Sequence, residues 1–304
     1  MQRKNMSTLK SDSILLLTAA IWGFAFAFQR QGMDHIGPFL YNGLRFALGC
    51  LALYPFTRFR KYRATFSFKH IYAGITAGAA LFIASSLQQI GLVYTTAGNA
   101  GFITGLYVIL VPFLGLLLHH QIGRHNWIAA LLAVSGLYLL SIHGTFTVKR
   151  GDAYVFFSAF FYAIHVHIIG HLAGRIRSGQ LAFIQYGACA VLSMIVAIIV
   201  EPMEWPSIYR AGIPILYGGL FSVGIAYSLQ IVGQKYAPPS HAVIFLSMES
   251  VFAVAGGSLL LNEQMPLRGL IGCGLMFMGM LISQLGQQKQ RRRDRRAAKM
   301  SSHN

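Results

Sequence analysis

Residues 98–118 read GNAGFITGLYVILVPFLGLLL, a run without one charged side chain. A helix needs about 20 mostly apolar residues to cross the hydrocarbon core of a bilayer. The apolar residues of this run form a continuous block and not a stripe along one face, which is typical of a helix surrounded by lipid. The run therefore predicts a membrane-spanning helix.

Nine further blocks of similar length and composition lie on either side of this run in the 304-residue chain. The chain is 55% hydrophobic and only 11% charged, which argues against a soluble fold. The first block follows basic residues as a signal peptide does, but it shows no small-residue cleavage motif, so we expect a retained helix. The sequence thus predicts an all-α integral membrane protein whose ten transmembrane helices cover residues 13–29, 36–56, 70–94, 98–118, 127–142, 151–171, 180–200, 213–234, 240–261 and 267–285.

The basic residues predict the orientation of these helices. With the amino terminus in the cytoplasm, nineteen of the 25 Lys and Arg residues fall on the cytoplasmic side and five on the opposite side. Arg45 is left inside a helix. Cytoplasmic loops carry an excess of Lys and Arg, so both termini are expected in the cytoplasm, which requires an even number of crossings. Short outer loops without a glycosylation motif fit a bacterial inner membrane.

The chain also contains a weak internal repeat. A shift of 142 residues places Ser86-Leu87-Gln88 on Ser228-Leu229-Gln230, and a shift of 140 places Trp22 on Tyr162. The repeated unit has five helices, an odd number, so the second copy must enter the membrane from the opposite side. The predicted organisation is a cytoplasmic N-terminus (1–12), a first repeat (13–145), a second repeat (146–286) and a basic cytoplasmic tail (287–304).

Two motifs give the sequence a family resemblance. Residues 97–107, AGNAGFITGLY, followed by Val111-Pro112-Phe113, resemble the fourth helix of the EamA family in the drug/metabolite transporter superfamily. Glu249-Ser-Val-Phe252 with the later Asn262-Glu263 is similar to the ninth-helix pattern of that family. The resemblance implies ten helices with a central cavity, and export or exchange of amino acids or related metabolites. Ser250 replaces the usual Pro of the ninth helix, a change expected to straighten it.

Arg45 and Glu249 are the charged residues that most need a partner. An ionisable side chain in hydrocarbon costs at least about 2.5 kcal/mol, so each should face a cavity or another polar group. Counting residues from the helix ends places both near the midplane, about 3 Å apart in depth. We expect them to pair in the empty cavity and to be separated by a zwitterionic or anionic substrate. A fixed structural ion pair, or an Arg45 that reaches toward the headgroups, is the alternative.

Further cavity residues follow from depth and symmetry. Trp22 and Tyr162 are repeat mates near mid-depth, and facing rings would form a slot for a flat or apolar group. Gln88 and Gln230, also repeat mates, could close the cavity or join helices. His165 is a candidate for a coupling proton, as is Glu249. Three tyrosines complete the predicted lining, although each could equally pack or face lipid: Tyr41, Tyr107 and Tyr186.

The sequence predicts a secondary transporter without a cofactor, a metal site or an enzymatic activity. It contains no Walker loop, no HExxH helix and no nucleophile elbow, and its three cysteines show no paired spacing. The basic run of residues 289–299 is expected to contact anionic lipid and not nucleic acid. The alternative is an intramembrane lipid-modifying enzyme, for which four residues near the membrane surfaces could be recruited: Asp34, His35, His119 and His120.

Overall fold

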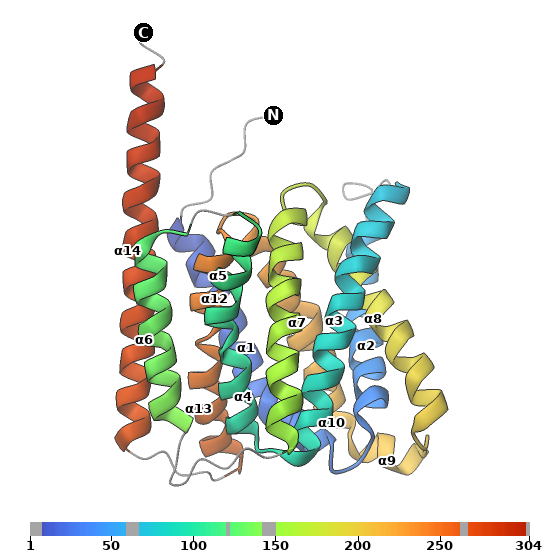
Figure 1. Cartoon of the computed structure of the whole chain (residues 1–304). Coiled ribbons are helices and arrows are strands. Elements are labelled where there is room, and N and C mark those ends of the chain that lie inside the picture. The colour runs from blue at the N-terminus through green and yellow to red at the C-terminus, as the bar shows by residue number, and fades with distance from the viewer. Residues whose placement is uncertain (1–7, 59–66, 120–121, 142–149, 262–266, 302–304) are drawn as a thin grey trace.

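The computed structural model describes residues 8–58, 67–119, 122–141, 150–261 and 267–301, which form helices joined by turns (Figure 1). All ten predicted spans are helical, and the prediction of an all-α membrane fold is confirmed. The helices are α1 (Thr8–Gly32), α2 (Pro38–Arg58), α3 (Phe68–Tyr94), α4 (Ala97–Gly105), α5 (Tyr107–Leu117), α6 (Arg124–Ser141), α7 (Arg150–Leu172), α8 (Ser178–Val200), α9 (Trp205–Arg210), α10 (Gly212–Leu216), η2 (Tyr217–Tyr227), α11 (Ser228–Gln234), α12 (Pro239–Leu246), α13 (Glu249–Leu261) and α14 (Leu267–Ser301).

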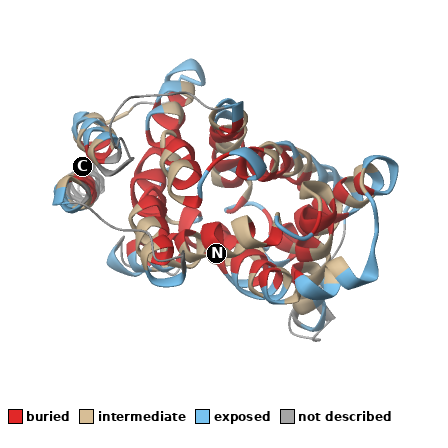
Figure 2. Ribbon diagram, turned by 90° about the horizontal axis from the view of Figure 1, so that it is seen from below, coloured by how far each residue is buried: buried red, intermediate tan, exposed pale blue. Residues whose placement is uncertain are grey.

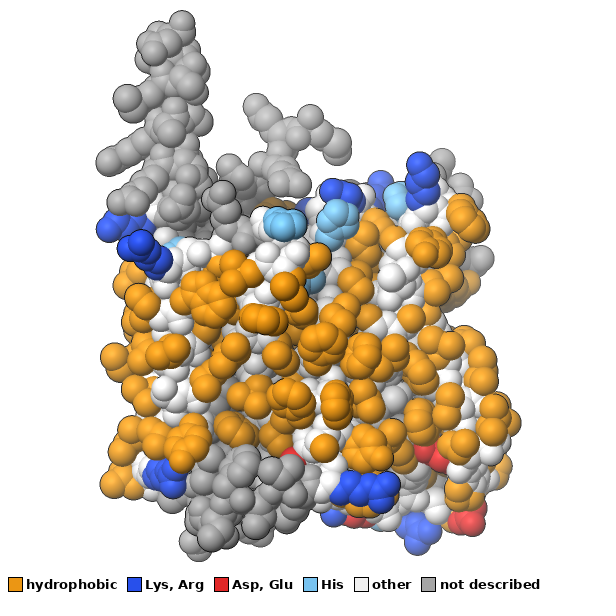
Figure 3. All heavy atoms as spheres, in the orientation of Figure 1, with side chains coloured by type: hydrophobic (Ala, Val, Ile, Leu, Met, Phe, Trp, Pro, Cys, Tyr) orange, Lys and Arg blue, Asp and Glu red, His pale blue; other side chains and the backbone are white. Residues whose placement is uncertain are grey.

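The outer surface of the bundle matches a bilayer. Seven of the helical segments are long and apolar enough to cross a membrane, and α14 adds a shorter apolar stretch, Leu270–Gly286. Figure 3 shows a broad belt of hydrophobic side chains between two edges that carry the charged residues. Backbone N–H and C=O groups find no water within such a belt, and a helix satisfies them internally. This is why the apolar blocks of the sequence become helices.

We call the end of the bundle at which α1 begins the upper end, as it lies in Figure 1, and the opposite end the lower end. The last helix, α14, also ends at the upper end. The first span of the first half, α1, runs downward, and the first span of the second half, α7, runs upward, as an inverted repeat requires. In Figure 2, seen from below, buried residues face the inside of the bundle and exposed ones its periphery.

The fourth and ninth spans are both interrupted. Leu106 separates α4 from α5, and Ser247-Met248 separates α12 from α13. Both junctions contain tight i to i−3 backbone bonds, from Ile109 N–H to Leu106 O (3.0 Å) and from Ser250 N–H to Ser247 O (3.1 Å). Leu106 and Met248 are related by the shift of 142 residues. The expectation that Ser250 straightens the ninth span is therefore wrong.

The eighth span is irregular in another way. Its central eleven residues, Tyr217–Tyr227, form a π-helix, whereas the equivalent third span, α3, is α-helical throughout. A π-turn widens the helix and is frequent at functional sites. Ser222 and Tyr227 of this segment face the interior. The two repeats therefore differ in backbone geometry at the centre of the bundle.

The halves pack against each other through close helix contacts. The pairs α3 and α7, α2 and α8, and α1 and α13 each join one helix from the first half to one from the second. Gly78 of α3 lies so near α8 that an added Cβ would meet the Gln185 carbonyl oxygen at 2.8 Å. At the edge of the bundle, α6 packs along α14, again one helix from each half.

Polar contacts join the halves at both ends. At the upper end, Asp12, Asn126, Ser240, His241 and Ser283 form a buried hydrogen-bonded cluster that we call the upper tie. The lower tie consists of two contacts. Thr95 donates to Oδ1 of Asp152 (2.7 Å), and Glu201 accepts from the backbone N–H groups of Phe39 (2.9 Å) and Leu40 (2.7 Å) at the start of α2.

Candidate functional site

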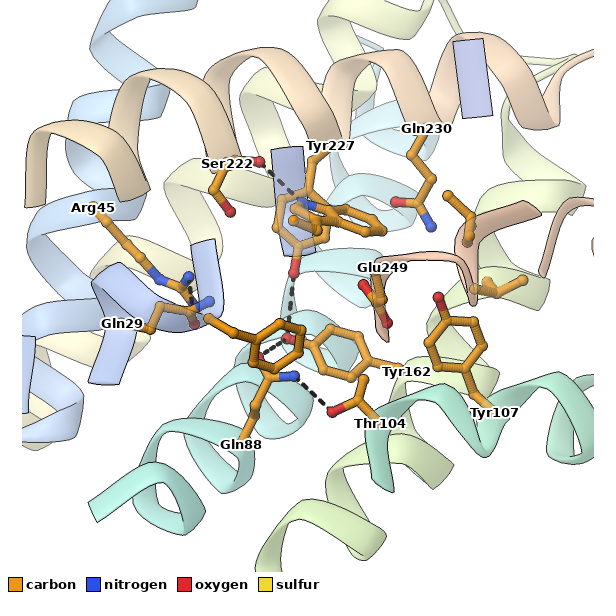
Figure 4. A pocket seen from close by; sticks show the side chains of 14 residues that line it. Gln29, Arg45, Gln88, Thr104, Tyr107, Tyr162, Ser222, Tyr227, Gln230 and Glu249 are labelled. Carbon is orange, nitrogen blue, oxygen red and sulfur yellow. Dashed lines mark hydrogen bonds between the residues drawn. The ribbon is translucent and has the colours of Figure 1, made fainter. Parts of the chain in front are cut away.

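A cavity lies at the centre of the bundle, between the two interrupted spans (Figure 4). Its walls come from α1, α2 and α3, from both interrupted spans, and from α7, η2 and α11, so both halves contribute. The cavity volume is about 30 Å³, which is room for roughly two water molecules. A larger molecule would fit only if the lining side chains moved apart.

Arg45 forms one pole of this cavity. It lies on α2, is 1% exposed, and donates from Nε to Oδ1 of Asn42 (2.9 Å) and from Nη1 to Oε1 of Gln29 (2.9 Å). The guanidinium carbon also lies 5.0 Å from the ring centre of Phe46, a cation–π distance. Nη2 has no hydrogen-bond partner. The side chain is therefore held firmly and keeps one free donor group.

Glu249 forms the second pole. As the first residue of α13 it follows directly on the break in the ninth span, and it is 3% exposed. Tyr107 of α5 lies beside it, but neither the Tyr107 hydroxyl nor Oε1 of Glu249 has a hydrogen-bond partner of good geometry. Tyr107 and Glu249 are repeat mates at the same position after their breaks. Interrupted helices therefore bring two polar groups to the cavity at the midplane.

Aromatic hydroxyls and amides occupy the space between the poles, as Figure 4 shows. The Tyr227 hydroxyl donates to that of Tyr162 (3.3 Å), which donates to Oε1 of Gln88 (3.1 Å). Gln88 in turn donates from Nε2 to the hydroxyl of Thr104 (3.0 Å). The ring of Trp22 meets that of Tyr227 edge-on, with centroids 4.6 Å apart. The result is a chain of polar groups along an aromatic wall.

The structure places seven of the ten predicted site residues in this lining: Trp22, Arg45, Gln88, Tyr107, Tyr162, Gln230 and Glu249. Arg45 and Glu249 do not form the expected ion pair with each other, because Gln29 and Asn42 hold the guanidinium at its own pole. Nor do Trp22 and Tyr162 form a slot of two facing rings, since Tyr227 contacts both.

The other three predicted residues lie outside the lining, and each is buried with a polar partner. Tyr41 donates its hydroxyl to the backbone oxygen of Pro214 (3.0 Å), His165 bonds Gln185 (3.0 Å), and Tyr186 bonds Ser228 (3.1 Å). They therefore support the walls from behind.

Seven lining residues were not predicted from the sequence: Phe26, Gln29, Thr104, Val166, Ser222, Tyr227 and Leu246. One signal was available for Gln29, because it follows Trp22 by two turns of the same helix and so shares its face. Tyr227 adjoins the Ser-Leu-Gln repeat motif but has Ser85 as its mate, so symmetry did not select it.

The residues considered for a lipid-modifying enzyme do not meet at one membrane surface. Asp34 and His35 follow α1 at the lower end, whereas His119 follows α5 at the upper end. His120 lies outside the described residues. Asp34 forms an exposed ion pair with Arg30 (2.6 Å). In the basic run 289–299, the side chains after Lys289 likewise lie outside the described part, so its lipid contact stays a prediction.

Comparison with known proteins gives one consistent result. The model of the EamA-like transporter family matches residues 9–142 and again residues 149–284. A relative from Archaeoglobus fulgidus named "Uncharacterized transporter" is 31% identical over 283 residues, which cover 93% of this chain and 88% of the relative. The "Uncharacterized transporter YoaV" of Bacillus subtilis is 22% identical over 292 residues, or 88% of this chain and 94% of its own.

A solved structure, titled "Crystal structure of protein", superposes with a TM-score of 0.75 at 19% identity, covering 92% of this chain and 99% of the other. At that identity the likeness supports the fold alone. The family match, in contrast, extends over both repeats and agrees with the ten spans and the motifs of the fourth and ninth helices. On this evidence, the chain belongs to the EamA-like transporter family.

Proposed function

We propose that this transporter moves a small zwitterionic metabolite, an amino acid or a close relative, by export or exchange through the central cavity. The observation that carries the proposal is the pair of opposite poles, Arg45 and Glu249, in one enclosed space with an unpartnered atom on each. A buried charged group with free hydrogen-bonding capacity is costly, and a ligand of complementary charge offsets that cost.

The poles suggest how a substrate would be recognised. Nη2 of Arg45 would bind a carboxylate, and Glu249 would bind an ammonium group, each by a charge-assisted hydrogen bond. The substrate's remaining part would lie against the rings of Trp22 and Tyr227, which favour apolar or flat groups. Because Asn42 and Gln29 hold the Arg45 guanidinium in place, the two poles would have to move apart to admit a substrate.

The two ties support alternating access as the mechanism. Contacts between the halves lie above and below a cavity that is too small for an amino acid, so a substrate would enter only when one tie breaks. Rocking of inverted repeats around a midplane site is the expected motion. The upper end would face the cytoplasm of a bacterial cell, in line with the excess of basic residues, and ion gradients would drive the cycle.

Counterflow into proteoliposomes, with a panel of labelled amino acids, tests the proposal. We expect uptake of at least one of them, and a loss of about tenfold or more for Arg45→Gln and for Glu249→Gln, because each charge-assisted bond contributes about 1.5–3 kcal/mol. Arg210→Gln, an exposed arginine at the lower end, is the matched control and should transport normally.

Two results would contradict this assignment. Full activity of both single variants would exclude the poles as the substrate site. Counterflow of a phospholipid, with none of any small zwitterion, would move the function to the lipid class.

A further inference from the structure

The upper tie contains a buried histidine–carboxylate pair that the central site does not use. Asp12 is 1% exposed and His241 is fully buried, and Nε2 of His241 lies 2.8 Å from Oδ1 of Asp12. His241 precedes Glu249 by eight residues on the ninth span, about 12 Å at the rise of a helix. The pair therefore lies between the cavity and the upper end of the protein.

The hydrogen bonds around His241 indicate which of its ring nitrogens carry protons. Nδ2 of Asn126 donates to Ser240 (3.3 Å), and Oδ1 of Asn126 accepts from the hydroxyl of Ser283 (3.1 Å). Ser283 has thereby used its only hydrogen, so its oxygen must accept from Nδ1 of His241 (2.8 Å). In this orientation of the Asn126 amide, Nδ1 therefore carries a proton.

A second proton must then lie on the other side of the ring. If only Nδ1 is protonated, Nε2 presents a lone pair to the Asp12 oxygen with no hydrogen between them. A hydrogen bond of 2.8 Å needs one, either on Nε2 or on the carboxyl group. In both cases the pair holds one proton more than a carboxylate and a neutral imidazole, and its net charge is zero.

Burial favours this neutral state. Oδ2 of Asp12 has no hydrogen-bond partner although it is buried. Loss of the shared proton to water would leave one uncompensated negative charge on Asp12, with that oxygen bare, inside the protein. Water entering from the upper end would solvate it.

The same side chains can also accommodate the state without the extra proton. Rotation of the Asn126 amide lets Nδ2 donate to Ser283, whose hydroxyl then donates to Nδ1 of His241. The ring keeps one hydrogen, on Nε2, for Asp12. No backbone change is needed for the exchange, so the cluster is suited to binding and releasing a proton repeatedly.

The tie joins the two halves, which links its protonation to their separation. Asp12 and Asn126 belong to the first half, and Ser240, His241 and Ser283 to the second, so three of its hydrogen bonds cross between halves. Other groups at this end set the local field, since α1, α5, α6, α7, α11 and α14 all pack on α12. The charged or titratable ones among the described side chains at this end of these helices are Lys10, Arg124, His125, His167, His171, Lys235 and Lys289.

We propose that the Asp12–His241 pair is a proton-binding site that locks the upper end: this end stays closed while the pair holds its proton and opens when the proton leaves to water there. The inference rests on the proposed transport function. It places the coupling proton at the upper tie, apart from the substrate poles. When a substrate enters from the upper side, the pair would release its proton to that same side.

Cysteine accessibility in nanodiscs tests the lock without a known substrate. In a background that lacks Cys50, Cys189 and Cys273, Leu246→Cys introduces a thiol where the upper part of the ninth span lines the cavity. Its labelling rate by a soluble maleimide is measured from pH 5.5 to pH 8.5. Asp34 is an exposed carboxylate at the lower end, and Asp34→Asn serves as the matched control. Its labelling rate includes the pH dependence that any thiol shows because of its own ionisation.

Asp12→Asn mimics the protonated carboxyl and should keep the upper end closed. We expect the labelling rate of the Asp34→Asn protein, divided by that of Asp12→Asn, to rise with pH toward about tenfold per pH unit, the limit for release of one proton. His241→Gln should also remove the pH dependence, whereas His125→Gln should retain it. In a variant in which Trp22 and Trp205 are replaced by Phe, the fluorescence of the remaining Trp127 should report the same transition.

Two outcomes would overturn the proton site. A ratio that does not change with pH excludes a linked proton, and faster labelling of Asp12→Asn at every pH indicates a merely structural tie. Counterflow separates this failure from that of the proposed function. If zwitterions are transported but the labelling ratio does not depend on pH, only the proton lock is contradicted. If the labelling ratio depends on pH but no zwitterion is transported, only the substrate assignment is contradicted.

Discussion

At Gly23, next to the cavity residue Trp22, the backbone of α1 lies close to that of α13. A Cβ added there would overlap the side chain of Phe252 and lie 2.7 Å from the backbone oxygen of Glu249. Both neighbours are held by the first turn of α13, so neither can move without shifting Glu249. The glycine next to Trp22 thus sets the distance between a cavity wall and its acidic pole.

Replacing this glycine should separate the two helices. We expect Gly23→Ala to lower the free energy of unfolding by about 1–3 kcal/mol, the usual cost of overpacking a tight contact, and to weaken transport. Thermal unfolding in detergent, followed by circular dichroism, measures the effect. Gly274→Ala on α14, where nothing lies within 4 Å, is the control and should be neutral or slightly stabilising. Equal stability of both variants would show that α1 adjusts without strain.

At the scale of residues, the sequence predicted those cavity residues whose charged side chains are costly to bury in a membrane. Arg45 and Glu249 were found because a charge in an apolar block needs a partner, and both line the cavity. Their hydrogen-bond partners were not found, since Asn42 and Gln29 are ordinary polar residues until packing brings them to the guanidinium. The Asp12–His241 pair joins residues 229 positions apart, and no local pattern connects them.

The start of α2 is held by a residue from the other half of the chain. The first N–H groups of a helix have no partner inside the helix. Here the Glu201 carboxylate, at the end of α8, accepts from the N–H groups of Phe39 and Leu40. Gly37 permits this approach, because a Cβ there would overlap the carboxylate. One side chain thus caps a helix and closes the lower end.

Changing Glu201 tests this cap. An amide has one oxygen where the carboxylate has two, so we expect Glu201→Gln to lower the free energy of unfolding by about 1 kcal/mol and Glu201→Ala by up to about 2 kcal/mol. Thermal unfolding in detergent at neutral pH is the measurement. Glu204→Gln, exposed at the same end, should unfold like the unaltered protein. If all three variants unfold together, the bonds to α2 contribute nothing net.

The positions of the spans were predictable at the scale of elements, because length and hydropathy alone decide which blocks cross a bilayer. Their internal irregularities were not. The π-helix of the eighth span occurs in residues 217–227, which contain no proline, and the break in the ninth span has none either. Both depend on packing against the other half, as the bond from Ser250 Oγ to Gly101 O (2.6 Å) illustrates.

In the whole molecule, polar ties join the two halves on either side of the small central cavity. Two carboxylates of the ties, Asp12 and Asp152, are repeat mates. Asp12 bonds His241 in the broken ninth span, and Asp152 bonds Thr95, which caps the end of α3 directly before the broken fourth span. In the proposed alternating access, these two contacts would be related latches, one at each end of the bundle. They differ chemically, since Asp12 faces a histidine and Asp152 a threonine hydroxyl. The proposed histidine–carboxylate proton site therefore occurs at the upper tie, whereas the lower tie has the carboxylates Asp152 and Glu201 without a histidine.

Weakening the lower latch should open that end alone. Thr95→Val removes a charge-assisted hydrogen bond of about 1.5–3 kcal/mol, which corresponds to about tenfold or more in the opening equilibrium. In the cysteine-free background, we expect labelling of Phe26→Cys, in the cavity lining, to rise by that factor and labelling of Leu246→Cys to fall. Thr76→Val, with its hydroxyl bonded only to Tyr72 of its own helix, is the control. A rise at both cysteines would mean general loosening.

The opposite directions of the halves have a consequence for synthesis. Each half has an odd number of spans, so the second half begins at the lower end, beside Arg150. If the upper end faces the cytoplasm, as proposed, this start must be moved across the membrane during insertion. The orientation of the second half then depends on Arg175, Arg177 and Lys235, which must stay on the side of synthesis. Moving these three basic residues to the loops at the other end would invert the second half. The first half would then lack the helices against which it packs.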